Sequence, residues 1–230
     1  MLVERHLERL NLPKTANILD VGCGTGGTTQ FLAKYGRVTG IDFSKDALEF
    51  ANRKKMDGVA FIEADANKIA SQFEPESFDL ITFFNVLYHK WIVDDVEVLK
   101  QVRTLLRPGG YVLLTEPAFK VLFRNHDIID SAKTRYQLSD FKTFFKKADL
   151  NYKTGHYFGT IAFPIALIMA IRDKFGTKEF ENENIAEMNL PSPAINDSLK
   201  NIFYLESRFN MFLPIPFGLT LLAIGQRKPK

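Results

Sequence analysis

The chain contains one cysteine, Cys23, among its 230 residues. A single thiol cannot form an internal disulfide, which excludes the small disulfide-stabilised secreted domains and is typical of proteins in a reducing compartment. Charged residues interrupt the N-terminal segment MLVERHLERL, so it lacks the apolar core of a signal peptide. We therefore expect a cytoplasmic protein.

The chain also lacks long apolar runs and a large excess of charge of one sign. The longest apolar run, residues 161–171, is much shorter than the ~20 residues that a membrane-spanning helix needs, so we expect no transmembrane segment. Lys and Arg total 30 against 27 Asp and Glu, and the basic residues are scattered apart from a small cluster at residues 227–230. This distribution does not favour a nucleic-acid partner. No Cys, His and carboxylate spacing predicts a metal site.

The pattern that is present alternates strands with helices. With 46% hydrophobic residues, the chain fits a single domain over residues 1–230. Strands are predicted at 18–22, 38–42, 59–63, 78–84, 111–115, 151–158 and 218–226. Helices are predicted at 2–10, from Ser44, at 93–106, and at 138–148 with Ser139 as its cap. We expect an α/β fold, a doubly wound Rossmann-like sheet of about seven strands, mostly parallel with an antiparallel last strand.

A glycine turn follows the first predicted strand in the segment ILDVGCGTGGTT. Gly22, Gly24 and Gly26 let the backbone approach a ligand closely, and Asp20 places a carboxylate at the start of the turn. The same segment also fits the dinucleotide fingerprint through Gly22, Gly24 and Gly27. The glycines alone therefore leave open whether the ligand is a pyrophosphate or a group of opposite charge.

Acidic residues recur where the first three strands end. Asp20 is in the first strand, Asp42 ends the second, and Asp65 follows the third. Asp42 comes 20 residues after Gly22, the spacing of a carboxylate that accepts hydrogen bonds from ribose hydroxyls. A dinucleotide site explains Asp42 but gives no role to the other two carboxylates. Either Asp42 or Asp65 taken singly is equally a helix or turn cap.

Four segments in this order resemble the class I S-adenosylmethionine-dependent methyltransferases: ILDVGCGTG, GIDFS, EADA and LLRPGGYVLLTEP. The resemblance covers roughly residues 15 to 150 and implies S-adenosyl-L-methionine as cofactor. It implies that Asp20 lies near the cationic methionine end, that Asp42 binds ribose and that Asp65 meets the adenine amino group. Phe43 would pack against adenine with Ala66 beside it.

Further candidates follow the fourth and fifth strands. Asn85 is a candidate cofactor contact, with a turn role as the alternative. His89 and His126 are the candidate catalytic bases, although either could be structural. His126 lies in the segment PAFKVLFRNHDIIDSAKTRY, whose HD followed by RY resembles a subgroup acting on sugars or lipid-linked sugars. Tyr88 and Glu116 are further polar side chains near these strand ends.

Two insertions are expected on the substrate side, at about residues 117–136 and 159–217. The second contains the apolar segments IAFPIALIMAI and FLPIPFGLTLL, with a hinge or loop at LPSP, residues 190–193. One interpretation is a buried helical cap or a contact in a homodimer. The other is an apolar lid, or a patch in peripheral contact with a membrane, that admits a hydrophobic acceptor.

These patterns predict a methyltransferase that acts on a small molecule, such as a sugar or a lipid-linked acceptor, by in-line methyl transfer. An oxygen nucleophile is preferred over nitrogen or carbon. The nearest alternative is an NAD(P)-dependent oxidoreductase of Rossmann type. A non-catalytic cofactor-binding protein on the same fold is the second alternative.

Overall fold

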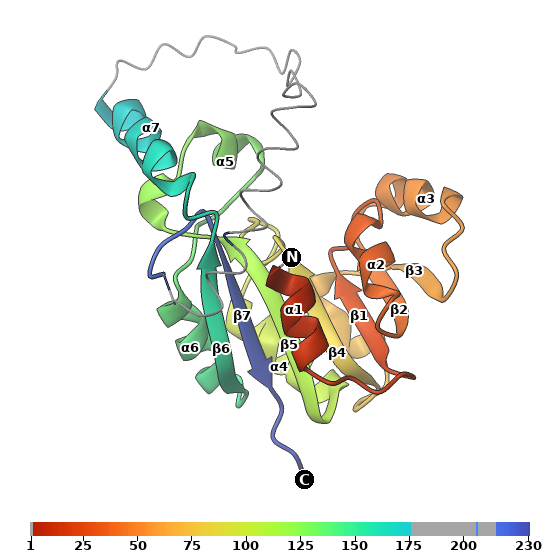
Figure 1. Ribbon diagram of the computed structural model, residues 1–230. Helices are drawn as coiled ribbons and strands as arrows, with labels where there is room; N and C mark the ends of the chain where they lie inside the picture. The colour runs from red at the N-terminus through yellow and green to blue at the C-terminus, as the bar shows by residue number, and fades with distance from the viewer. Residues whose placement is uncertain (1, 176–205, 207–214) are drawn as a thin grey trace.

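A seven-stranded sheet organises the computed structural model, which describes residues 2–175, 206 and 215–230. The strand order is β3-β2-β1-β4-β5-β7-β6 (Figure 1). The strands are β1 (Asn17–Val21), β2 (Arg37–Asp42), β3 (Val59–Glu63), β4 (Phe78–Phe84), β5 (Leu106–Pro117), β6 (Asn151–Phe158) and β7 (Thr220–Gln226). The pairs from β3 to β5 are parallel, whereas β7 is antiparallel to both β5 and β6. The expected doubly wound sheet with an antiparallel last strand is confirmed.

Helices cover both faces of the sheet. They are α1 (Leu2–Arg9), α2 (Gly27–Leu32), α3 (Lys45–Arg53), α4 (Asp95–Leu105), α5 (Asn125–Ile129), α6 (Leu138–Lys147) and α7 (Phe163–Phe175), with 3₁₀ turns η1 (Ala66–Ser71) and η2 (Lys120–Leu122). One core cluster joins the sheet to α4, α6 and η1, and a second joins it to α1 and α2. Leu80 of β4 belongs to the second cluster and Ile81 to the first. Burial on both faces explains why the central strand β4 reads as a nearly continuous apolar run.

Two local predictions need correction. The segment Pro108-Gly109-Gly110 does not separate α4 from β5, because the strand already begins at Leu106, which pairs with Phe78 before a register shift. The Gly109 N–H donates to the Arg227 carbonyl and Gly110 accepts from the Arg227 N–H, so the glycines stay bound to the sheet.

The second correction concerns helix caps. Ser139 lies inside α6, whose N-cap is Gln137, and the Asp140 carboxylate accepts from the Gln137 N–H at 2.8 Å. The prediction for Ser44 is confirmed, since its hydroxyl accepts from the Ala47 N–H at 3.3 Å at the start of α3. A serine can cap a helix only from the position just before the first turn, which Ser44 occupies and Ser139 does not.

The expected insertions are described only in part. Within residues 117–136 the structure has η2 and α5, and α7 occupies the beginning of 159–217. The predicted hinge at residues 190–193 lies outside the described residues. Within the described part of the chain, no helix combines the length and apolar character needed to cross a bilayer.

Candidate functional site

The turn between β1 and α2 depends on two glycines. Gly22 has a φ of +69°, and a Cβ there would lie 2.5 Å from Val86 Cγ2. Gly26 has a φ of +80°, and a Cβ there would lie 2.8 Å from Phe61 Cζ. A Cβ on Gly27 would meet open space. The packing therefore requires glycine at positions 22 and 26, whereas Gly24 is favoured only by its φ of +51°. It gives no reason for Gly27, the third glycine of the dinucleotide fingerprint.

Asp20 lies behind this turn. Its side chain is buried and accepts hydrogen bonds from the hydroxyls of Thr29 at 2.7 Å, Thr28 at 3.2 Å and Thr82 at 2.8 Å. Burial raises the pKa of Asp20 to about 6, although the three hydroxyls favour the carboxylate. Asp20 thus links β1, α2 and β4 and does not line the pocket described below. Its contact with a methionine end stays a prediction.

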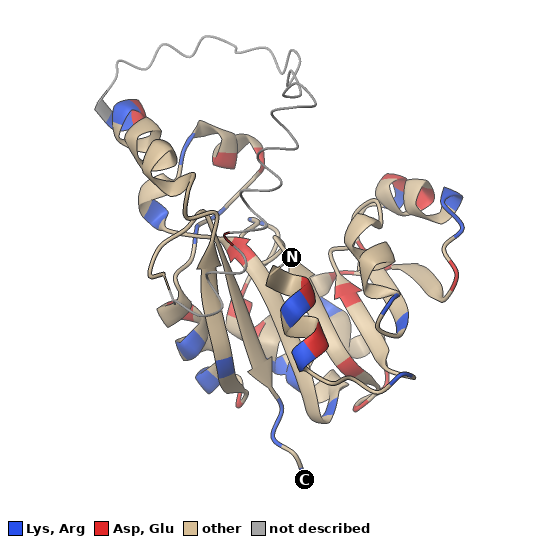
Figure 2. Ribbon diagram, viewed as in Figure 1, with Lys and Arg blue, Asp and Glu red and all other residues tan. Residues whose placement is uncertain are grey.

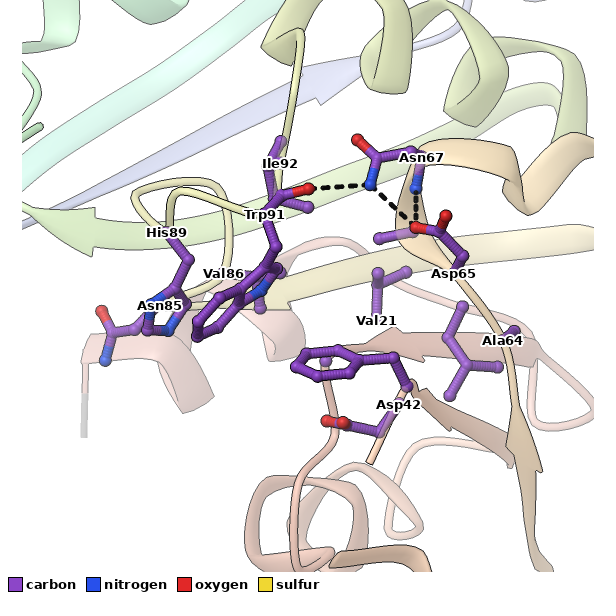
Figure 3. Close-up of a pocket in the computed structure, with 14 residues that line it drawn as sticks. Val21, Asp42, Ala64, Asp65, Asn67, Asn85, Val86, His89, Trp91 and Ile92 are labelled. Carbon is purple, nitrogen blue, oxygen red and sulfur yellow. Dashed lines mark hydrogen bonds between the residues drawn. The ribbon is translucent and has the colours of Figure 1, made fainter. Parts of the chain in front are cut away.

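Asp42 holds the glycine turn against the end of β2. Its Oδ2 accepts from the Gly24 N–H at 2.8 Å and its Oδ1 accepts from the Ser44 N–H at 2.9 Å. Each carboxylate oxygen has a second lone pair. The side chain lines the pocket (Figure 3), so these lone pairs are suited to accept hydrogen bonds from a ligand diol.

A pocket of about 370 Å³ opens at the carboxyl ends of β1, β2, β3 and β4. This is the edge at which open parallel sheets bind ligands, beside the point where the strand order reverses. Seven predicted site residues line it: Gly22, Asp42, Phe43, Asp65, Ala66, Asn85 and His89. The remaining lining residues are Val21, Ile41, Ala64, Asn67, Val86, Trp91 and Ile92. Gly24 and Gly26 shape the turn without lining the pocket.

Asn67 joins two walls of the pocket (Figure 3). Its Nδ2 donates to Asp65 Oδ1 at 2.8 Å and to the Trp91 carbonyl at 2.9 Å, while its Oδ1 accepts from the Val93 N–H at 2.9 Å. Asp65 also caps η1, accepting from the Asn67 N–H at 2.8 Å. Asp65 therefore has both the capping role and the place in the pocket that the sequence left as alternatives.

Exposed aromatic rings form another wall. Phe43 is 57% exposed and Trp91 is 40% exposed. Their ring centroids lie 5.3 Å apart at 61°, and the His89 ring stacks on Trp91 at 3.9 Å and 19°. Aromatic faces left accessible in a pocket suit a flat ligand. Neither Asn67 nor Trp91 was predicted from the sequence to line the pocket. The available signal was that Trp91 is the single tryptophan of the chain.

Glu116 at the end of β5 organises the segment after β4. Its carboxyl group is buried and accepts from the Val86 N–H at 3.1 Å, the Leu87 N–H at 2.8 Å and the Tyr88 N–H at 3.2 Å. Asn85 precedes this segment with a φ of +58°, and its N–H donates to the Thr115 carbonyl. Glu116 thus shapes the pocket wall and does not offer a base to a substrate.

The pH dependence of stability tests this role. Burial raises the pKa of Glu116 from 4.5 to about 8. Between these values the unfolded chain has released the proton and the folded chain retains it, so stability falls as pH rises. We expect Glu116→Gln to flatten the loss of melting temperature between about pH 5 and about pH 8 relative to the unmodified protein. Parallel curves for the two proteins would contradict the assignment.

The two candidate histidines lie in different environments. His89 is half-buried, and its Nδ1 lies 3.0 Å from the Asp130 carbonyl. A carbonyl can only accept, so Nδ1 is the donor and Nε2 of the neutral ring is an acceptor. Burial lowers the pKa of His89, which favours the neutral ring. His126 is 57% exposed, does not line the pocket, and its Nε2 lies 3.2 Å from Arg135 Nη2.

Asp127, Arg135 and Tyr136 of the HD and RY pairs form a buried anchor. Asp127 and Arg135 are both buried, with Arg135 Nε 2.9 Å from Asp127 Oδ1 and Nη2 3.2 Å from Oδ2. Asp127 also accepts from the Arg124 N–H at 2.8 Å. The Tyr136 hydroxyl donates to the Leu87 carbonyl at 2.9 Å. These residues therefore connect the segment after β5 to the wall of the pocket, and the sugar-related interpretation of the motif has no support here.

Known proteins match this chain in sequence and in fold. A family model described as a methyltransferase domain matches residues 12–161. The demethylmenaquinone methyltransferase of Staphylococcus aureus is 35% identical over 132 residues, which are 52% of this chain and 53% of that protein. The chain thus spans about half the length of the curated relatives it matches.

Two solved structures share the fold. One is a putative methyltransferase in complex with the Haloferax volcanii Trm112 methyltransferase activator, with a TM-score of 0.65 and 18% identity over 99% of this chain and 89% of that chain. The other is an S-adenosylmethionine-dependent methyltransferase from Mesorhizobium loti, with a TM-score of 0.64 and 16% identity over 99% of this chain and 98% of that chain. The family match covers more than half of the chain. The chain therefore belongs to the methyltransferase domain family.

Proposed function

We propose that this protein transfers the methyl group of S-adenosyl-L-methionine to a hydroxyl of a small hydrophobic acceptor. The observation that carries the proposal is the pocket at the strand ends, where Asp42, Asp65 and the aromatic wall converge beside His89. The relative from Staphylococcus aureus is named for a demethylmenaquinone acceptor, which supports a small molecule over a macromolecule. The exposed apolar helix α7 supports a hydrophobic one.

In this proposal the chain's residues bind, orient and remove a proton. Asp42 accepts hydrogen bonds from the ribose hydroxyls and Asp65 from the adenine amino group. Phe43 and Trp91 lie against the adenine plane. The bound cofactor supplies an electrophilic sulfonium methyl, and the acceptor oxygen must lie in line with it at about 3 to 3.5 Å. His89 Nε2 takes the proton from the acceptor hydroxyl.

Cofactor choice can be followed through Trp91, the only tryptophan in the chain. Because its ring lines the pocket, we expect S-adenosylhomocysteine to change its fluorescence emission in a saturable titration. NAD(H) is the control ligand, and Trp91→Phe removes the signal. An emission change with NAD(H) and none with S-adenosylhomocysteine would favour the oxidoreductase alternative.

His89→Gln tests the base. Glutamine keeps a polar side chain of similar size but cannot take a proton, so we expect turnover to fall about 10²–10⁴-fold while S-adenosylhomocysteine still binds. The measurement is transfer of labelled methyl from S-adenosylmethionine to separated hydrophobic and polar cell extracts. His126→Gln is the matched control and should leave turnover unchanged.

The pH dependence of turnover is a second test of His89 as the base. With an active His89, turnover should rise with pH through the lowered pKa of His89 and then level off, and His89→Gln should lose this limb. Cofactor binding without transfer to any fraction would favour the non-catalytic alternative. Transfer confined to the polar extract would contradict a hydrophobic acceptor.

A further inference from the structure

Helices α5 and α7 expose an unusual number of large apolar side chains. Ile128 and Ile129 of α5 are 55% and 68% exposed, and Ile165 and Ile168 of α7 are 64% and 67% exposed. We call this region the α5–α7 surface, and its apolar members are Val121, Ile128, Ile129, Ile161, Ile165, Ile168 and Ile171. Scattered exposed apolar residues are ordinary, but a group contributed by neighbouring elements indicates a binding surface.

The exposed face of α7 is a stripe at helical spacing. Ile165 and Ile168 are three residues apart, which places them on one side of α7, and Ile161 lies in the turn just before the helix. Arg172 continues the same stripe one turn later and is also exposed. Ala170, which lies away from this stripe, is buried. The apolar stripe thus faces outward and ends in a cation.

Among the described residues the net charge around the stripe is positive, because three exposed cations outnumber the exposed Asp130 at the end of α5. Lys120, Arg172 and Lys174 are exposed, and among the described residues none of them takes part in an ion pair. The acidic neighbour Asp173 is neutralised, because its Oδ2 lies 2.6 Å from Arg124 Nε. Figure 2 shows a mostly uncharged α7 with blue and red together near its far end. An apolar surface with cations at its rim suits the headgroup region of an anionic bilayer.

The position of this surface relates it to the pocket. The segment holding α5 follows β5 and α7 follows β6, so both helices project from the sheet edge where the pocket opens (Figure 1). The ion pair between Arg124 and Asp173 joins the segment before α5 to α7. An acceptor dissolved in a bilayer would therefore arrive on the side of the molecule that carries the pocket.

We propose that the α5–α7 surface docks on membranes containing anionic lipid, with the apolar stripe inserted among the headgroups and the rim cations on phosphate. The idea that this docking delivers a hydrophobic acceptor from the bilayer to the pocket rests on the proposed function. The docking itself depends only on these side chains.

Vesicle flotation of the full chain tests the proposal. We expect the protein to float with vesicles of 70% phosphatidylcholine and 30% phosphatidylglycerol in 0.1 M salt, and at least tenfold less in 0.5 M salt or with phosphatidylcholine alone. The double variant Ile165→Asp with Ile168→Asp should lose at least tenfold of the bound fraction. Phe50→Asp is the matched control, because Phe50 is 52% exposed on α3 and should float normally.

A charge variant separates docking from damage to the fold. Arg172→Glu with Lys174→Glu keeps the apolar stripe and should lose binding to anionic vesicles. Trp91 emission with S-adenosylhomocysteine should be unchanged in every variant, so failure of the proposed function is seen separately from failure of docking. The proposal is overturned if the unmodified protein does not float or if the double aspartate variant floats equally. It is also overturned if that variant only converts a dimer into monomers.

Discussion

Replacing Asp42 by alanine is expected to weaken S-adenosylhomocysteine binding about fivefold to 150-fold, from the roughly 1 to 3 kcal/mol cost of leaving buried polar groups without a partner. The carboxylate does two things at once. It would accept from the ligand ribose, and it already accepts from the Gly24 and Ser44 N–H groups. Its loss therefore removes a ligand contact and loosens the glycine turn.

Calorimetry measures this effect, and Asp46→Ala provides its control. Asp46 is an exposed acid in the first turn of α3, four residues after Asp42, so its removal should leave the dissociation constant unchanged. A folded Asp42→Ala protein with unmodified affinity would mean that the ligand does not contact the end of β2.

The second large effect concerns stability rather than binding. Asp127→Ala would leave the Arg135 guanidinium buried without its carboxylate, and breaking a buried pair in this way costs about 3 to 5 kcal/mol. Urea denaturation should show this as a large drop in the free energy of unfolding. The adjacent His126→Ala should change stability by less than ~0.5 kcal/mol, because that side chain is mostly exposed.

A double replacement distinguishes an anchor from a catalytic group. Asp127→Ala combined with Arg135→Met removes both charges, and we expect it to be less destabilising than Asp127→Ala alone. A fully stable Asp127→Ala protein that has lost turnover would instead place Asp127 in the chemistry.

The fold could be predicted from the sequence where side-chain patterning decides the structure. The strands β3, β4 and β6 begin and end at the predicted residues. For β4 the reason is burial, because a buried parallel strand is a short apolar run between turn residues. The start of β5 could not be predicted, since the bonds of Gly109 and Gly110 to Arg227 join residues far apart in the chain. The N-cap of α6 was also predicted wrongly, because it depends on whether Gln137 or Ser139 lies just before the first turn.

The residues of the candidate site could likewise be predicted from the sequence only in part. Asp42 and Gly22 belong to local motifs whose chemistry the sequence displays, and both line the pocket. Trp91 lies in the pocket beside Asn67, which donates to its carbonyl from another element, and no local pattern predicts that contact. His89 and His126 were equivalent in sequence; burial and pocket lining separate them.

The antiparallel pairing of β6 with β7 has a consequence for how this enzyme could diversify. Phe158 and Thr220 are directly paired, so the long connection between them leaves and re-enters the sheet at one point. The entropy of closing a flexible loop grows only by about 0.6 kcal/mol for each doubling of its length. A lineage can therefore lengthen, shorten or exchange that connection while the strand ends that carry the pocket stay in place.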